Sequence, residues 1–153
     1  MAQSWLTEDQ QRIWRNYLAL GSRLQVVMNR QLQERCGLSL ADYEVLVALS
    51  ERGPVRVLEL AAALDWEQSR VSHQLRRMRA RGLLERRDSE DDRRGATIEI
   101  AAAGRDALAS AAPDHVNLVR SVLFDGMTVA QLRGFDEVIG TALDRLADLI
   151  SRP

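Results

Sequence analysis

The sequence contains no lysine, so all 21 of its basic residues are arginines. It has one cysteine, Cys36, which excludes an intrachain disulfide and a thiolate metal cluster. No apolar run is long enough to cross a membrane and no signal-peptide pattern opens the chain, so we expect a cytoplasmic protein without a membrane partner. The sequence also lacks a motif-placed Ser/His/Asp set, a glycine-rich phosphate loop and a cluster of metal ligands. We therefore expect no enzyme, no metal and no cofactor.

Cys36 lies near the end of a predicted helix, beside Gly37. The simpler interpretation is a half-buried small apolar residue. The alternative is a redox-sensing thiol, which requires an exposed and activated sulfur. The sequence leaves both interpretations open.

Positive and negative charges nearly balance over the whole chain, but the positive charge is concentrated in one stretch. The 153 residues carry a net charge of -1, which argues against a globally basic protein. From Arg70 to Arg87, however, there are seven arginines and His73 against a single acid, Glu85. A local cationic face of this kind is sufficient to attract phosphate groups.

Much of that charge falls in a predicted helix within Asp65 to Arg81. Val71, Leu75 and Met78 recur at i, i+4 and i+7, which gives one apolar stripe. Asp65 is expected to cap the start of the helix, with Gln68 reaching back, and Gly82 to supply a left-handed stop. At about 100° per residue, the face opposite Val71 carries cations and short side chains: Ser69, Arg70, His73, Arg76, Arg77 and Ala80.

The helix is preceded by a short helix, predicted at Glu59 to Leu64, and followed by two predicted strands, Leu83 to Arg87 and Ala96 to Ala101. The alternation of apolar and polar residues along the second strand is typical of a half-buried hairpin. Two helices joined by a short turn and followed by a hairpin form a winged helix-turn-helix. The fold class predicted is mainly α, with a small β-hairpin wing.

Long helices flank this region. Capping boxes that begin at Thr7 and Thr128 open helices at either end of the chain, and Ser39 caps another helix over Leu40 to Arg52. A further helix is expected from about Ala103 to Leu123, broken or kinked early by Pro113. The terminal helices have wider apolar faces than one chain can cover, so residues 1–36 and 103–153 are predicted to form a homodimer interface and residues 37–102 a DNA-binding region.

The order of short motifs resembles that of the MarR (multiple antibiotic resistance regulator) family, and the likeness covers nearly the whole chain. The residues that carry it are Leu60-Ala61, Ser69-Arg70-Val71-Ser72, Arg81-Gly82-Leu83-Leu84-Glu85-Arg86, Asp92-Arg93-Arg94 and Ile98-Glu99-Ile100. The resemblance implies a homodimeric transcriptional regulator, expected to be a repressor, that binds a pseudo-palindromic operator in double-stranded DNA. It also implies release by a small ligand, for which we expect an aromatic or phenolic compound.

Within this frame, Arg70 and Arg77 are the first candidates for groove contacts, because arginine can bind guanine or phosphate through two hydrogen bonds. Ser69 and Ser72 are short enough to approach phosphate oxygens, and His73 and Arg76 are weaker candidates. By family analogy, Asp92 and Arg94 shape the wing, and Arg93 or Arg94 enters the minor groove. The alternative for each of these residues is an ordinary solvent-facing side chain.

A ligand pocket would lie where the flanking helices meet the winged region. Its candidate lining residues are Trp14, Tyr17, Arg23, Tyr43 and His115, although aromatic residues at helical spacing more often belong to a core. A second functional class also remains open, a winged-helix module whose arginine face binds an acidic protein. The acidic wing tip and the low net charge favour that alternative.

Overall fold

A computed structural model describes residues 5–87 and 96–151. The chain divides into two compact units, residues 1–115 and 116–153. The first unit contains helices α1 (Glu8–Cys36), α2 (Leu40–Arg52), α3 (Val57–Leu64) and α4 (Gln68–Ala80) with a small sheet, and helix α5 (Ala102–Val119) runs across the division. The described part of the chain is mainly helical, which confirms the predicted fold class.

The first two helices begin where the sequence predicts. The Thr7 hydroxyl accepts a hydrogen bond from the Gln10 backbone N–H at 3.3 Å, and the Gln10 side chain accepts one from the Thr7 N–H at 2.9 Å. The same reciprocal capping box joins Ser39 and Asp42 at the start of α2. Gly37 ends α1 in the left-handed conformation at φ 64°, which a residue without a side chain adopts at little cost.

The joint between α3 and α4 differs from the prediction. Helix α3 begins at Val57, two positions before the predicted Glu59. Asp65 does not cap α4: it ends α3 in the left-handed region at φ 52°, and the N-cap of α4 is Glu67, whose side chain makes no capping hydrogen bond. A short polar side chain is among the few that tolerate this conformation, and it lets the Trp66 N–H donate to the Ala61 carbonyl at 3.0 Å.

A three-stranded antiparallel sheet in the order β1-β3-β2 completes the winged helix. Strand β1 (Val55–Arg56) pairs with β3 (Thr97–Ile100), and β3 pairs with β2 (Leu84–Arg87) so that Leu84 faces Ile100. Strand β2 begins one residue later than predicted, and β3 is one residue shorter than predicted at each end. The tip of the wing, residues 88–95, lies outside the described residues.

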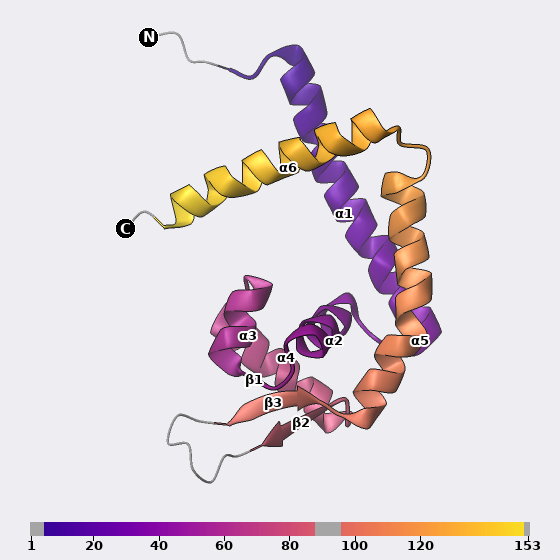
Figure 1. The fold of residues 1–153 in the computed structure, drawn as a ribbon, viewed down its shortest axis with the longest axis vertical. Coiled ribbons are helices and arrows are strands. Elements are labelled where there is room, and N and C mark those ends of the chain that lie inside the picture. The colour runs from indigo at the N-terminus through magenta and orange to yellow at the C-terminus, as the bar shows by residue number, and fades with distance from the viewer. Residues whose placement is uncertain (1–4, 88–95, 152–153) are drawn as a thin grey trace. The chain divides into compact units, whose positions relative to one another are not determined.

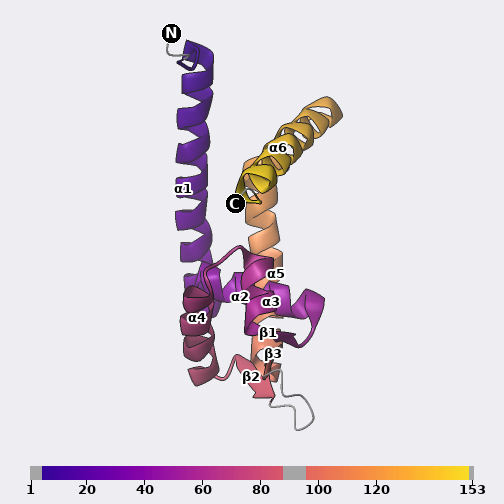
Figure 2. The same ribbon diagram turned by 90° about the vertical axis from the view of Figure 1, so that its left-hand side faces the viewer.

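The core of the first unit forms where α2, α3 and α4 gather beside the sheet (Figure 1). The predicted stripe of α4 is its inner face, because Val71 and Met78 are 0% exposed and Leu75 is 3% exposed. Leu32 and Leu38 bring the end of α1 into the same core. The N-terminal half of α1 extends beyond this cluster, as Figure 2 shows, and its apolar side chains are exposed.

Helix α5 packs closely at Gly104, so we expect alanine to be less well tolerated there than at a glycine with open space around it. A Cβ at Gly104 would collide with the Leu83 carbonyl oxygen, and that oxygen already accepts the Ala101 N–H at 3.0 Å. We expect Gly104→Ala to lower the free energy of unfolding by about 2 kcal/mol, the usual scale of overpacking. Gly134→Ala in the last helix, α6 (Val129–Ile150), meets nothing within 4 Å and is the matched control, expected to raise stability by up to about 1 kcal/mol. Urea unfolding of both variants measures the difference, and equal stabilities would contradict the packing.

The second unit contains η1 (Arg120–Phe124) and α6. The helix predicted from Ala103 to Leu123 is α-helical only from Ala102 to Val119, with Pro113 inside it, and then continues as the π-helical turn η1. The Thr128–Gln131 capping box opens α6 as predicted. No described residue of α6 is buried, and its exposed apolar side chains are Val129, Leu132, Val138, Ile139, Leu143, Leu146, Leu149 and Ile150. Among the described residues, no helix is long and apolar enough to span a bilayer.

Candidate nucleic-acid interface

Helix α4 presents an arginine-rich face to solvent. All of the residues predicted for this face are exposed: Ser69, Arg70, His73, Arg76, Arg77 and Ala80. Ser72, which was predicted as a further DNA contact, is half-buried. Arg79 is exposed on the same helix and was not among the predicted contacts. With the opposite stripe sealed in the core, this face cannot turn inward without unpacking the unit. A fixed, outward, cationic helix is the arrangement needed to meet a phosphate backbone.

Arg70, one of the two first candidates, is held near the base of this face. Its guanidinium carbon Cζ lies 3.8 Å from the ring centroid of Trp66, a cation–π contact. The positive charge of Arg70 also acts on the carboxyl group of Glu44 on α2. Burial raises the pKa of Glu44, and the positive charge of Arg70 partly opposes that rise. Arg70 therefore connects α4 electrostatically to α2.

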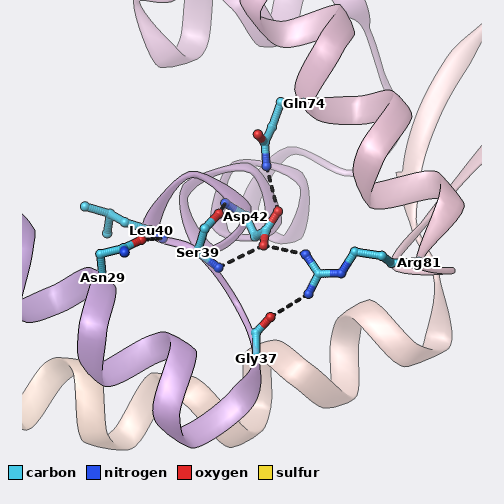
Figure 3. A network of polar contacts seen from close by, with 7 residues as sticks. All are labelled: Asn29, Gly37, Ser39, Leu40, Asp42, Gln74 and Arg81. Atoms are coloured by element: carbon cyan, nitrogen blue, oxygen red, sulfur yellow. Dashed lines mark hydrogen bonds and ion pairs between the residues drawn. The ribbon is translucent and has the colours of Figure 1, made fainter.

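A buried carboxylate fixes the orientation of α4 from behind (Figure 3). Asp42 is only 2% exposed and accepts three hydrogen bonds from three different segments. Gln74 of α4 donates to its Oδ1 at 2.6 Å, while the Ser39 N–H donates to Oδ2 at 2.8 Å and Arg81 Nη1 donates to Oδ2 at 2.7 Å. Each acceptor oxygen is thus satisfied, which offsets the cost of burying the charge.

Arg81 extends this network to the end of α1. Its Nη2 donates to the Gly37 carbonyl at 2.6 Å, so one guanidinium joins the C-terminal end of α4 to both the α1–α2 joint and the first turn of α2 (Figure 3). Asn29 of α1 adds a bond from the opposite side, because its Oδ1 accepts the Leu40 N–H at 2.9 Å. The polar network made by Asn29, Gly37, Ser39, Leu40, Asp42, Gln74 and Arg81 is called the Asp42 network below.

A shallow hollow of about 540 Å³ lies beside the outer face, between α4 and β2. Arg76, Arg79 and Arg86 line it, together with the single acid Glu85. Sequence reasoning identified Arg76 but not Arg79 or Arg86 as part of this surface. The signal for Arg86 was its place in a predicted strand next to a cationic helix. The predicted wing residues Asp92, Arg93 and Arg94 lie outside the described residues.

The residues proposed for a ligand pocket separate into two groups. Tyr43 and His115 contact each other, with ring centroids 4.3 Å apart. Trp14 and Tyr17 instead stack on one another at 5.6 Å in the exposed half of α1, where Arg23 is also exposed. At about 1.5 Å per helical residue, Trp14 is roughly 20 Å along α1 from Met28. Trp14 and Tyr17 therefore lie away from Tyr43 and His115.

Tyr43 and His115 line a groove of about 420 Å³, called the α2 groove below. Trp66, the residue beneath Arg70, lines the same groove, and so does Glu44. Sequence reasoning missed both, because nothing in their spacing relates them to a residue near position 115. The full lining consists of Met28, Leu40, Tyr43, Glu44, Val47, Ala48, Glu51, Arg52, Ala63, Leu64, Trp66 and His115.

Comparisons with known proteins agree with this geometry. The MarR family model matches residues 38–95. The crystal structure of AbsC, a MarR family transcriptional regulator from Streptomyces coelicolor, is 34% identical, with a TM-score of 0.88 over 95% of this chain and 99% of that one. Sco3205, a MarR family transcriptional regulator from the same organism solved in complex with DNA, is 33% identical, with a TM-score of 0.86 over 93% of this chain and 94% of that one.

A more distant relative extends the comparison. The transcriptional regulator BldR from Sulfolobus solfataricus is 28% identical, with a TM-score of 0.70 over 90% of this chain and 99% of that one. No curated protein sequence matches the chain. The AbsC likeness spans nearly both full chains, including the helices outside the winged region, so the family resemblance of the motifs is confirmed. The chain belongs to the MarR family of transcriptional regulators.

Proposed function

We propose that the protein is a sequence-specific DNA-binding transcriptional regulator, a repressor that binds a pseudo-palindromic operator as a homodimer. The observation that carries the proposal is helix α4, whose arginine face is exposed while Val71, Leu75 and Met78 anchor its other side in the core. The 33% identical relative solved with DNA supports the same use of the fold. In a helix-turn-helix protein the second helix enters the major groove.

We assign different DNA contacts to the residues of α4 according to the length of their side chains and where they lie. Arg77 is exposed on the outer face and has a length and planar donor set suited to guanine O6 and N7. We propose Ser69, Ser72 and His73 as donors to phosphate or base edges, and Arg76, which lines the hollow beside β2, as a contact to the DNA backbone. For the wing, Asp92 is proposed to orient the hairpin, while Arg93 or Arg94 reaches the minor groove.

The proposed dimer rests on the apolar faces of the long helices. The apolar side chains of α6 are exposed, and those of the outer half of α1 are exposed as well, including Ile13, Tyr17 and Leu18. Large exposed apolar patches mark interaction sites in soluble proteins. We assign residues 1–36 and 103–153 to dimerisation and residues 37–102 to DNA, so that two copies of α4 meet successive turns of the duplex.

One experiment tests the core of this function. Duplexes bound by the full chain are selected from a random library, and the complex is then sized by gel filtration. An enriched sequence with two inverted half-sites, and a complex containing two chains, are the expected results. If random duplex at low salt shows no binding at all, the arginine face would instead favour an acidic protein partner.

Arg77→Ala is expected to weaken binding to the selected duplex by about 1–3 kcal/mol and to relax the preference at one base pair of each half-site. The reason is the loss of paired hydrogen bonds to a base edge. Arg12→Ala is the matched control outside the proposed DNA-binding region, because Arg12 is an exposed helical arginine with an ion pair to Asp9 at 2.7 Å, and gel filtration checks that this variant keeps the oligomeric state of the parent. Fluorescence anisotropy over a set of single-base variants measures both effects. If the two variants bind alike at every base, Arg77 does not read the groove.

We further propose that the α2 groove is the site of a small effector that releases DNA. Its volume lies within the range of ligand pockets, and it contains aromatic rings and apolar side chains with a few polar groups. Tyr43, Trp66 and His115 supply the rings. The proposed effector site keeps two of the five predicted pocket residues, Tyr43 and His115. In place of the other three it has residues of α2, α3 and the α3–α4 joint.

A further inference from the structure

The α2 groove is lined by a half-buried carboxylate, Glu44, and by Trp66, and both of these residues interact with Arg70. We propose that its ligand is an apolar organic monocation, and that this cation competes with Arg70 for Glu44 and Trp66. The proposal rests on the proposed function, since it names the ligand class and the regulation of the same groove. It adds a positive charge to the aromatic or phenolic ligand that the family resemblance led us to expect.

The charges along the groove favour a cation. Glu44 and Glu51 both lie on α2, seven residues apart, and so share one face of the helix. Glu44 is half-buried, whereas Glu51 and the lining cation Arg52 are exposed at the end of the helix. A charge at the half-buried position is screened less by solvent than one at the exposed positions. A ligand that enters the groove therefore meets a carboxylate at short range, which repels an anion and attracts a cation.

The aromatic lining points the same way. Trp66 already holds a guanidinium 3.8 Å from its ring centroid, which shows that its face accepts positive charge in this environment. His115 adds little charge of its own, because burial lowers its pKa and favours the neutral ring. The remaining wall is apolar, formed by side chains such as Leu40, Val47 and Leu64, and this suits a cation with an apolar body.

The coupling to DNA follows from shared partners. Glu44 and Trp66 line the groove, and both also interact with Arg70 at the base of the proposed DNA-binding face. A bound cation that takes the Glu44 carboxylate and the Trp66 ring removes the cation–π contact of Arg70 with Trp66 and its electrostatic attraction to Glu44. Arg70 then has to be ordered again when DNA binds, so the ligand weakens DNA binding. By linkage, DNA weakens ligand binding by the same factor.

Two probes of the same shape and opposite charge test the ligand class. Tetraphenylphosphonium and tetraphenylborate are titrated into the full chain by calorimetry. We expect tetraphenylphosphonium to bind at least about tenfold more tightly than tetraphenylborate, because a partly desolvated charge pair attracts the cation and repels the anion. Glu44→Gln, which keeps the shape of the side chain, should reduce that preference about tenfold. Glu51→Gln, the exposed control on the same face, should change it less than about twofold.

The effect on DNA is measured separately, by anisotropy on the selected duplex with and without saturating tetraphenylphosphonium. We expect DNA affinity to fall at least about fivefold, within the usual range of allosteric coupling. Equal binding of the two probes, or no binding of the phosphonium, overturns the ligand class. Phosphonium binding that leaves DNA affinity unchanged overturns the competition with Arg70. If the parent binds no DNA, the proposed function fails, while the calorimetric comparison still decides which charge the groove accepts.

Discussion

Raising the salt concentration from about 50 to about 200 mM is expected to weaken binding to a DNA duplex about a thousandfold, provided that about six phosphates are contacted. The cause is counterion release, because each arginine that neutralises a phosphate frees a condensed cation, and added salt makes that release less favourable. Apart from Arg77, which is proposed to read a base edge, helix α4 has three exposed arginines, Arg70, Arg76 and Arg79, so two copies of the chain supply six such cations. The protein as a whole is slightly acidic, so this dependence has to arise from the local face.

The slope of the plot of log affinity against log salt tests where the phosphate contacts lie. Arg76→Ala should lower the magnitude of the slope by about one for each copy bound and weaken all sequences equally, because a backbone contact carries no base information. Arg12→Ala should leave the slope unchanged. A parent slope near zero, or an equal change for both variants, would contradict an interface built on α4.

Much of the fold could be predicted because its signals are local. Ser39 and Asp42 are three residues apart, so their capping box can be read from the sequence alone, and the same holds for Thr7 with Gln10. The buried stripe of α4 follows from helical spacing. Asp65 misled the prediction for a physical reason: aspartate favours both helix N-caps and the left-handed conformation, and here the second preference decides where α3 ends.

The contacts that organise the candidate site are long-range, and no spacing rule encodes them. Asp42 meets Gln74 and Arg81 from 32 and 39 positions away. Gln74 precedes Leu75 of the inner stripe, and nothing in that position indicates a contact with Asp42. The α2 groove depends in the same way on Tyr43 meeting His115, so aromatic residues at plausible helical positions, such as Trp14, could not be separated from true lining residues.

Asp42→Ala is expected to lower the free energy of unfolding by about 3 kcal/mol. The variant loses the hydrogen bond that the Asp42 carboxylate accepts from the Ser39 N–H in the capping box of α2, worth about 1 kcal/mol, and it leaves the donors of Gln74 and Arg81 without their acceptor. This loss of stability is smaller than that for breaking a fully buried ion pair, because the Arg81 side chain is 42% exposed and can turn to water. Asp9→Ala, which removes an exposed acid paired with Arg12, is the control and should cost less than about 1 kcal/mol.

Asp42→Asn separates charge from shape. All three groups around Asp42 are donors, so an amide can satisfy only one side and must point its own N–H groups at the rest. We expect urea unfolding to show a loss for the asparagine variant too, and a double-mutant cycle with Arg81→Ala to give a coupling of at least about 1 kcal/mol. Because Gln74 and Arg81 belong to α4 and its C-terminal end, the same variants should bind the selected duplex more weakly under conditions where they remain folded. Asparagine with parental stability and parental DNA affinity would show that the Asp42 network does not hold α4 in place.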